Sequence, residues 1–239
     1  MNPEPPAGCW ALLPASGKGT RIGADRPKQY LELAGRSILQ HTLERLLSHP
    51  SIDGAVLVLA ADDQHWSGLG LEFDKPVILA NGGAERFHSV RNGLARLAEQ
   101  CVGNPLVLIH DAVRPLVAHK DLDRLIEQAS MKPDGALLAT PVADTLKRDD
   151  GAGRVAATQD RRHLWRACTP QAFLLSLIRQ ALDAAMKQGL ELTDDASAME
   201  AAGYRPRLVQ CEPSNFKITH PSDIRLAEVL LAWQRDQAD

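Results

Sequence analysis

The chain has 239 residues, of which 44% are hydrophobic and 24% charged, and its formal net charge is −3 at pH 7. This length lies near the upper limit for one hydrophobic core, so we expect a single globular domain over residues 1–239. The acidic balance argues against nucleic acid as a partner, and the lack of an apolar run of roughly 20 residues argues against a membrane partner.

Short apolar runs alternate with amphipathic segments over the first 140 residues. The spacing of apolar residues at i, i+3, i+4 and i+7 predicts helices near 90–101 and 122–129. Near-continuous apolar strands are typical of a parallel sheet that is covered on both faces. We therefore expect an α/β, Rossmann-like, mostly parallel doubly wound sheet, with ligands beyond the carboxyl ends of its strands. The predicted strands are 9–14, 55–59, 76–79, 106–109 and 135–139.

The alternation breaks after Pro141, where two short segments, 142–148 and 154–158, flank a turn rich in Asp and Gly. This pattern predicts a hairpin, and a small polar hairpin is barely stable alone in water. We expect residues 142–162 to form a protruding β-arm that packs on another subunit. Beyond the arm, the sequence predicts helices around 172–186 and 194–202, a strand near 208–211 and a last helix from Pro221.

The four cysteines lie far apart and form no CxxC pair. They predict buried thiols rather than a zinc site or a disulfide framework. The amino-terminal residues lack the basic and then apolar stretches of a signal peptide, so a cytoplasmic location is expected.

The strongest functional signal follows the first predicted strand, in the stretch Pro14-Ala-Ser-Gly-Lys-Gly-Thr-Arg21. Glycines after a strand allow backbone N–H groups to face a phosphate, and neighbouring Lys and Arg add positive charge. The stretch is not a P-loop, because Leu12 stands where that motif needs Gly, and Ile22 breaks the GxGxxG pattern. Taken alone, it could equally be a surface turn with solvated charges.

This stretch resembles the glycine-rich signature of the 2-C-methyl-D-erythritol 4-phosphate cytidylyltransferase family. Further stretches resemble the same family in order along almost the whole chain: 82–90, 110–115, 141–148, 160–171, 193–197 and 215–219. Three positions depart from the family's usual residues: Ser16 and Val113, where Ala is common, and Ala84, where an acidic residue is common.

The resemblance implies transfer of CMP from CTP to 2-C-methyl-D-erythritol 4-phosphate in the non-mevalonate isoprenoid pathway. The products would be 4-diphosphocytidyl-2-C-methyl-D-erythritol and pyrophosphate. It implies four catalytic residues, Arg21, Lys28, Arg161 and Lys217. The implied CTP site comprises Pro14, Ala15, Ser16, Gly17, Gly19, Gly82, Gly83, Ser89, Asp111 and Ala112. The implied acceptor site comprises Asp111, Arg114, Thr145, Arg161, Thr193 and Lys217.

The resemblance also implies a homodimer in which the arm brings Arg161 and Thr145 to the partner's site. Mg²⁺ is the expected cofactor, bound mainly through the CTP phosphates, with Asp111 as the one candidate protein ligand. His110 is expected to be structural, because a phosphate monoester is largely ionised near neutral pH and needs no general base.

Two other functions remain compatible with these residues. One is a cytidylyltransferase for ribitol 5-phosphate or another sugar phosphate, which would use the same chemistry. The other is a non-catalytic nucleotide-binding module, since a fold alone does not fix a function. Turnover with each acceptor separates the first alternative, and the presence of Arg21, Lys28 and Lys217 argues against the second.

Overall fold

A seven-stranded sheet forms the centre of the computed structural model, which describes residues 6–17 and 26–236. Its strand order is β11-β7-β10-β6-β1-β4-β5, and β10 alone runs antiparallel to its neighbours. The mostly parallel α/β fold class is therefore as predicted. The strands are β1 (Cys9–Pro14), β4 (Gly54–Leu59), β5 (Val77–Asn81), β6 (Leu106–Ile109), β7 (Ala136–Pro141), β10 (Trp165–Leu174) and β11 (Arg207–Gln210).

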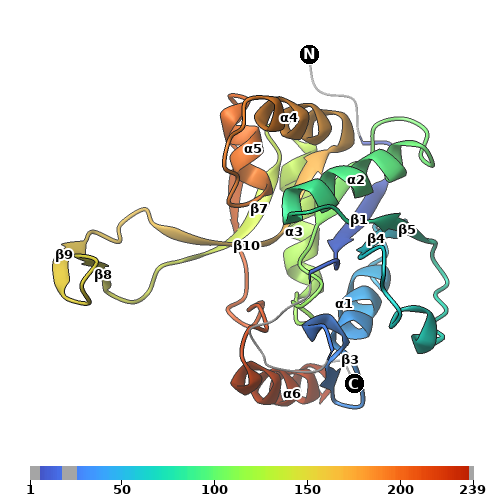
Figure 1. The fold of residues 1–239 in the computed structure, drawn as a ribbon, viewed down its shortest axis with the longest axis horizontal. Coiled ribbons are helices and arrows are strands. Elements are labelled where there is room, and N and C mark those ends of the chain that lie inside the picture. Colours follow the sequence, from blue (N-terminus) through green and yellow to red (C-terminus); the bar gives the residue numbers. More distant parts are fainter. Residues whose placement is uncertain (1–5, 18–25, 237–239) are drawn as a thin grey trace.

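Helices cover both faces of this sheet (Figure 1). One face packs on α1 (Ile38–Leu47) and α3 (His119–Ser130), and the other on α2 (Arg86–Ala98), α4 (Leu175–Lys187) and α5 (Asp195–Ala201). Alternation along β1 illustrates this: Leu13 packs in the core on the α1 side, and Leu12 in the core on the α2 side. Both strand faces are buried, which explains the continuous apolar runs in the sequence.

A third, smaller core lies under the last helix, α6 (Pro221–Asp236), which begins at the proline as predicted. Leu231 of α6 packs near Leu33 and Ile38 in this core. Leu33 belongs to a small two-stranded sheet that precedes α1. The remaining short elements of the body are η2 (Lys28–Tyr30), β2 (Glu32–Leu33), β3 (Arg36–Ser37) and η3 (Ser67–Leu69).

The helix predicted around 172–186 is α4, but it begins at Leu175, because 172–174 form the end of β10. Gln171 to Leu174 pair antiparallel with β6, and Phe173 is fully buried. Apolar periodicity cannot separate a buried strand end from the helix that follows it directly. The expectation of buried thiols also holds only for Cys9 and Cys211, since Cys101 and Cys168 are half-buried; all four cysteines are free.

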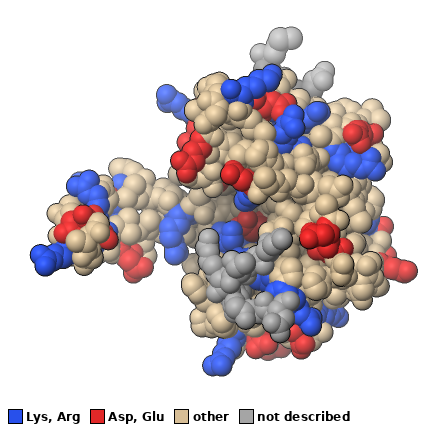
Figure 2. Space-filling model, viewed as in Figure 1, with Lys and Arg blue, Asp and Glu red and all other residues tan. Residues whose placement is uncertain are grey.

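The arm stands away from the body, as Figure 1 shows at its left. Its tip is a separate two-stranded antiparallel sheet of β8 (Leu146–Asp149) and β9 (Val155–Gln159). Basic and acidic side chains gather there in Figure 2, and Val155 is 64% exposed. The hairpin is thus as predicted, and its packing on a second subunit stays a prediction. In the described ranges no helix is long and apolar enough to cross a membrane.

Candidate active site

The candidate site lies where the chain reverses its direction of travel across the sheet. From β1 the chain continues to β4 and β5 on one side, and then returns to β6 on the other side. Loops that leave the ends of β1 and β6 diverge at such a point and leave a crevice between them. A cavity of about 550 Å³ opens there, lined by Pro14, Ala15, Ser16, Gly17, Lys28, Gln29, Gly83, Ala84, Glu85, Arg86, Asp111, Ala112, Val113, Lys217 and Thr219.

A buried glutamine holds the start of the glycine-rich loop in place. Gln29 Nε2 donates to the carbonyl oxygens of Ala15, at 2.6 Å, and Gly17, at 3.3 Å. Its neighbour Lys28 lies on the same short turn and lines the cavity, with Nζ 3.4 Å from the Ile218 carbonyl oxygen. The turn therefore sets the loop and the lysine together. The sequence assigns no role to Gln29, and its only signal is its place beside Lys28.

The two loops that the resemblance assigns to the nucleotide touch each other. A side chain at Gly82 would place its Cβ 2.4 Å from Ser16 Cβ, so glycine is required by close approach. Ser89 Oγ lies 2.8 Å from Ser16 Oγ and accepts a hydrogen bond from the Gly83 N–H at 3.0 Å. Ser89 is buried and lies in the first turn of α2. The hydroxyl of Ser89 thus connects the loop after β1, through Ser16, to the loop after β5, through Gly83.

Asp111 is surrounded by three cationic side chains. Its Oδ2 lies 3.1 Å from both Lys217 Nζ and Arg114 Nε, and its Oδ1 lies 3.7 Å from Arg86 Nε. Burial alone would raise the pKa of Asp111, but Lys217, Arg86 and Arg114 hold that pKa well below its usual range. Around the cavity the cations Lys28, Arg86, Arg114 and Lys217 outnumber the carboxylates Glu85, Asp111 and Asp195 by one, which leaves a small excess of positive charge among the described residues. Such a surface suits phosphate groups.

His110 has the structural position that was expected of it. Its ring is fully buried, Nδ1 lies 3.0 Å from Thr169 Oγ1, and Nε2 lies 3.0 Å from the Arg114 carbonyl oxygen. A carbonyl can only accept, so Nε2 carries the proton and Nδ1 accepts from the hydroxyl. Burial lowers the pKa of His110 to about 4. Thr169 also accepts from the Asp111 N–H at 3.0 Å, so this neutral histidine supports the loop that carries Asp111.

The predicted site residues fall into three groups in the structure. Most line the cavity, and Gly82, Ser89 and Arg114 contact residues that do. Thr145, Arg161 and Thr193 are exposed and do not line it within the single chain. Gly19 and Arg21 lie outside the described residues. Sequence reasoning placed five cavity residues beyond Gln29 in none of the predicted sites: Ala84, Glu85, Arg86, Val113 and Thr219.

The donor groups at this cavity fit a metal ion that arrives with the nucleotide. Among residues 6–17 and 26–236, no cluster of three or more His, Cys, Asp or Glu could hold a metal ion. The carboxylates that line the cavity are Glu85 and Asp111. Mg²⁺ commonly binds substrate phosphates and waters with only one or two protein carboxylates. A site with few acidic side chains is therefore compatible with nucleotide-bound Mg²⁺.

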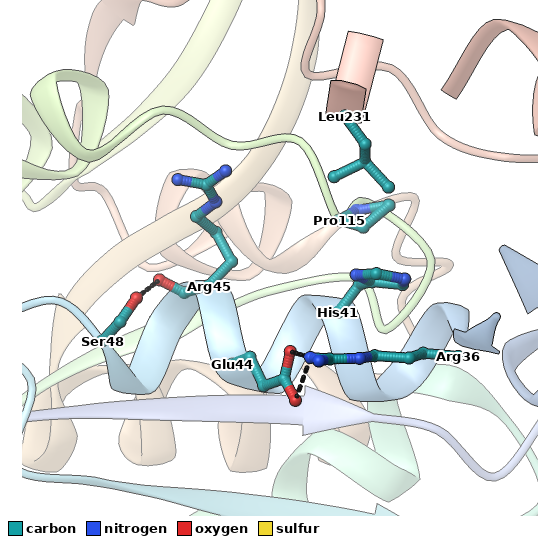
Figure 3. A pocket seen from close by; sticks show the side chains of 7 residues that line it. All are labelled: Arg36, His41, Glu44, Arg45, Ser48, Pro115 and Leu231. Carbon is teal, nitrogen blue, oxygen red and sulfur yellow. Dashed lines mark hydrogen bonds and ion pairs between the residues drawn. The ribbon is translucent and has the colours of Figure 1, made fainter. Parts of the chain in front are cut away.

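A second cavity, of about 370 Å³, lies between α1 and α6 (Figure 3). The polar side chains there bind one another: Arg36 Nη1 donates to both carboxylate oxygens of Glu44, at 3.0 and 2.8 Å. Arg45 donates to Gln234 Oε1 at 2.8 Å. None of the predicted site residues that the structure describes lines this cavity, so it is not the candidate site. Its lining is Arg36, His41, Glu44, Arg45, Ser48, Pro115 and Leu231.

Comparison with known proteins agrees with this geometry. Residues 9–233 match the family model described as 2-C-methyl-D-erythritol 4-phosphate cytidylyltransferase (IspD). Proteins with that name from Halorhodospira halophila and Pseudomonas aeruginosa PAO1 are 52% and 50% identical, over 95% and 90% of this chain and 95% and 92% of their own lengths. A crystal structure of 4-diphosphocytidyl-2C-methyl-D-erythritol synthase is similar with a TM-score of 0.83 and 38% identity, covering 94% of this chain and 98% of that one. This chain therefore belongs to the 2-C-methyl-D-erythritol 4-phosphate cytidylyltransferase family.

Proposed function

We propose that this chain transfers CMP from CTP to 2-C-methyl-D-erythritol 4-phosphate and releases pyrophosphate, as one nucleotidyltransferase domain over residues 1–239. The observation that carries the proposal is the shared cavity of Lys28, Lys217 and the close-packed glycine loops at the sheet's switch point. The glycine loops offer backbone groups to a base and phosphates, and the lysines offer charge. A reaction between two anions requires both the positioning of the reactants and the stabilisation of their negative charge.

In the proposed reaction, a phosphate oxygen of the acceptor attacks the α-phosphorus of CTP. A new P–O bond forms as the bond to the β-phosphate bridging oxygen breaks, and pyrophosphate leaves with that electron pair. Lys28 and Arg21 would stabilise charge on the triphosphate, and Lys217, Arg114 and Arg161 would hold the acceptor phosphate in line. The acceptor phosphate is already ionised, so no side chain has to remove a proton.

Mg²⁺ would neutralise part of the charge of the nucleotide phosphates. Asp111 is the protein ligand that we propose for it. Three cationic side chains already contact this carboxylate, so the ion would be held mainly by the nucleotide. The side chains of the protein would hold CTP and the acceptor in place and would neutralise the negative charge of both substrates.

We further propose a cytoplasmic homodimer in which residues 142–162 of each chain reach the partner's site. The exposure of Thr145 and Arg161 on a projecting arm supports this, since both would otherwise lie outside any site. Thr193, which is exposed beside the N-terminus of α5, would complete the acceptor pocket.

The function is tested by measuring pyrophosphate release with purified protein, Mg²⁺ and CTP. We expect turnover with 2-C-methyl-D-erythritol 4-phosphate and little with ribitol 5-phosphate, and little with ATP, GTP or UTP in place of CTP. Turnover with ribitol 5-phosphate alone would assign the chain to the other acceptor. Binding of CTP without turnover on either acceptor would favour the non-catalytic alternative.

A further inference from the structure

Arg86 and Asp195 form a buried ion pair beside the candidate site. Nη1 and Nη2 of Arg86 donate to Oδ1 and Oδ2 of Asp195, at 2.9 and 2.8 Å. The Asp195 side chain is 1% exposed, and the Arg86 side chain is 35% exposed and lines the cavity. Two parallel hydrogen bonds between a guanidinium and a carboxylate fix the direction of both groups. One end of this pair is therefore anchored in the protein interior, and the other faces the site.

The pair connects the parts of the site that surround the two substrates. Arg86 is the first residue of α2 and follows the Gly82–Gly83 loop, and Asp195 is the first residue of α5, two residues after Thr193. The start of α5 is itself fixed, because Asp194 accepts from Ser197 N–H at 2.9 Å in a capping box. The two hydrogen bonds to the buried Asp195 therefore orient the guanidinium of Arg86.

The free edge of that guanidinium meets Asp111. Arg86 Nε lies 3.7 Å from Asp111 Oδ1, and the opposite oxygen, Oδ2, lies 3.1 Å from Lys217 Nζ. Arg114 Nε occupies the remaining side of Oδ2, also at 3.1 Å. The position of the Asp111 carboxylate thus depends on cations from three segments of the chain, and Lys217 is positioned by the same carboxylate.

We propose that Arg86, anchored by Asp195, is a positioning residue for the acceptor-phosphate half of the site, acting through Asp111 on Lys217. This inference rests on the proposed function for the identity of the acceptor. A positioning role can be told apart from direct substrate binding by the Arg86 charge. Asp195 is buried and does not line the cavity, so a substitution there changes the position of Arg86 and leaves its charge in place. The positioning role also differs from a purely structural ion pair, which would affect folding and leave both substrates bound equally well.

Asp195→Asn is the informative variant, because it keeps the positive charge of Arg86 in the cavity and removes only its ionic anchor. We expect the KM for 2-C-methyl-D-erythritol 4-phosphate to rise at least fivefold while the KM for CTP stays within twofold. The matched control is Asp183→Asn, which breaks another Arg–Asp pair between α2 and a helix on the same face of the sheet. Arg91 Nε of α2 and Asp183 Oδ1 of α4 lie 2.6 Å apart, and both side chains are about half exposed and do not line the cavity. Both KM values of the control should equal those of the wild type.

The double variant Arg86→Met/Asp195→Leu separates positioning from stability. Replacing both members of a buried ion pair by hydrophobic residues of similar volume often leaves stability unchanged, whereas removing one leaves an uncompensated charge. We expect a melting temperature near that of the wild type together with a KM for the acceptor raised at least tenfold. Arg86→Lys, which keeps the charge but loses the paired hydrogen bonds, should raise this KM at least threefold and serves if the neutral variants do not fold.

The positioning role would be overturned if the folded variants had the same KM values as the Asp183→Asn control. This applies to Asp195→Asn, to the double variant and to Arg86→Lys. An equal rise in both KM values would assign the pair a structural role and overturn it as well. A wild-type enzyme without turnover on this acceptor would contradict the proposed function instead. The positioning role would then be read from calorimetric binding of inorganic phosphate, which Asp195→Asn should weaken at least fivefold and Asp183→Asn should leave unchanged.

Discussion

At the scale of single residues, the candidate site separates the residues that carry charge from those that hold them. Lys28 and Lys217 are charged and line the cavity, whereas Gln29 and His110 are uncharged and buried. Gln29 fixes the backbone next to Lys28, and His110 fixes the loop that carries Asp111. Because the two kinds of residue have different surroundings, their substitution should affect different quantities.

Lys28→Ala should lower turnover by about 10² to 10³-fold, because one charge that stabilises the transition state contributes on the order of 3 to 4 kcal/mol. Its melting temperature should stay close to that of the wild type, since substitution of a half-buried lysine outside the hydrophobic core changes stability little. Steady-state rates and thermal melting measure the two effects. Lys120→Ala, which removes an exposed lysine paired with Glu212, is the control. Near-normal turnover of Lys28→Ala would remove this residue from the catalytic set.

Arg21→Ala should behave in the same way, on the strength of its place in the glycine-rich stretch. Its structure lies outside the described residues, so the prediction rests on the sequence resemblance alone. Comparison of the two variants shows whether the triphosphate needs both charges. A rate loss for Lys28→Ala without one for Arg21→Ala would restrict that role to the lysine.

His110 should make the stability of the protein depend on pH below neutrality. Burial lowers its pKa to about 4 in the folded chain, against about 6.5 in the unfolded chain. Between these values the unfolded state binds more protons, so stability falls as the pH drops from about 6.5 towards 4 and is fully present above 6.5. The contribution is at most about 3 kcal/mol.

Melting temperatures recorded from pH 7.5 to 5 test this prediction. The wild type should lose more stability over that range than His110→Gln, which has no imidazole to protonate, although the variant is less stable at pH 7.5. His65→Gln, which changes an exposed histidine, should follow the wild type. Parallel curves for wild type and His110→Gln would show that the buried imidazole does not set this pH dependence.

At the scale of elements, the sequence predicts where the site lies, but it does not predict which side chains pair with each other inside the site. The loops after β1 and β6 could be placed at one edge of the sheet, because apolar runs and glycines mark where strands end. The roles of Gln29 and Arg86 could not be predicted. The partner of Gln29 is a backbone carbonyl in the glycine-rich loop, and the partner of Arg86 lies 109 residues further along the chain. Periodicity reports on burial within one segment, and such pairings depend on how segments meet.

The long strand β10 shows the same limit for the fold. Its first half, from Trp165, pairs only with β7 at the base of the arm, and its second half pairs with both β7 and β6 in the core. The pairing is irregular between Ala167 and Gln171, so exposure does not alternate regularly along the strand. The strand therefore has no single period from which it could be predicted. The arm hairpin was predictable because its turn residues are local.

Gly82→Ala should weaken CTP binding by pushing two loops apart. The added Cβ would lie 2.4 Å from Ser16 Cβ and 3.2 Å from the Leu59 carbonyl oxygen, so the Ser16 loop has to move. We expect the KM for CTP to rise about tenfold, with a smaller effect on the acceptor. Gly68→Ala is the control, because nothing lies within 4 Å of the added methyl group.

A second substitution, which removes the side chain that the new methyl group would contact, tests this explanation of the Gly82 variant. Ser16→Gly in the Gly82→Ala background takes away the Cβ and Oγ that the new methyl group would meet, so part of the CTP affinity should return. A double variant as weak as Gly82→Ala would show that the Leu59 side or the glycine backbone itself causes the loss.

At the scale of the whole molecule, the arm is the one feature that a single chain does not explain. Burying apolar surface is the main favourable contribution to folding, yet β9 is almost entirely exposed. An isolated two-stranded hairpin is marginal in water, and a closed twofold dimer would bury both arms in equivalent contacts. The body supplies Lys28 and Lys217, and the arm carries Arg161 and Thr145. A site assembled across two chains would unite these groups.

Mixing two inactive variants tests that arrangement. Lys28→Ala carries its lesion in the body and Arg161→Ala carries its lesion in the arm. If arms reach the partner's site, a mixed dimer has one site with both lesions and one with neither. Random pairing gives about half mixed dimers, so roughly a quarter of wild-type activity should return. If each arm served its own chain, every site would keep one lesion, and no activity would return under conditions where subunit exchange is shown independently by mass spectrometry.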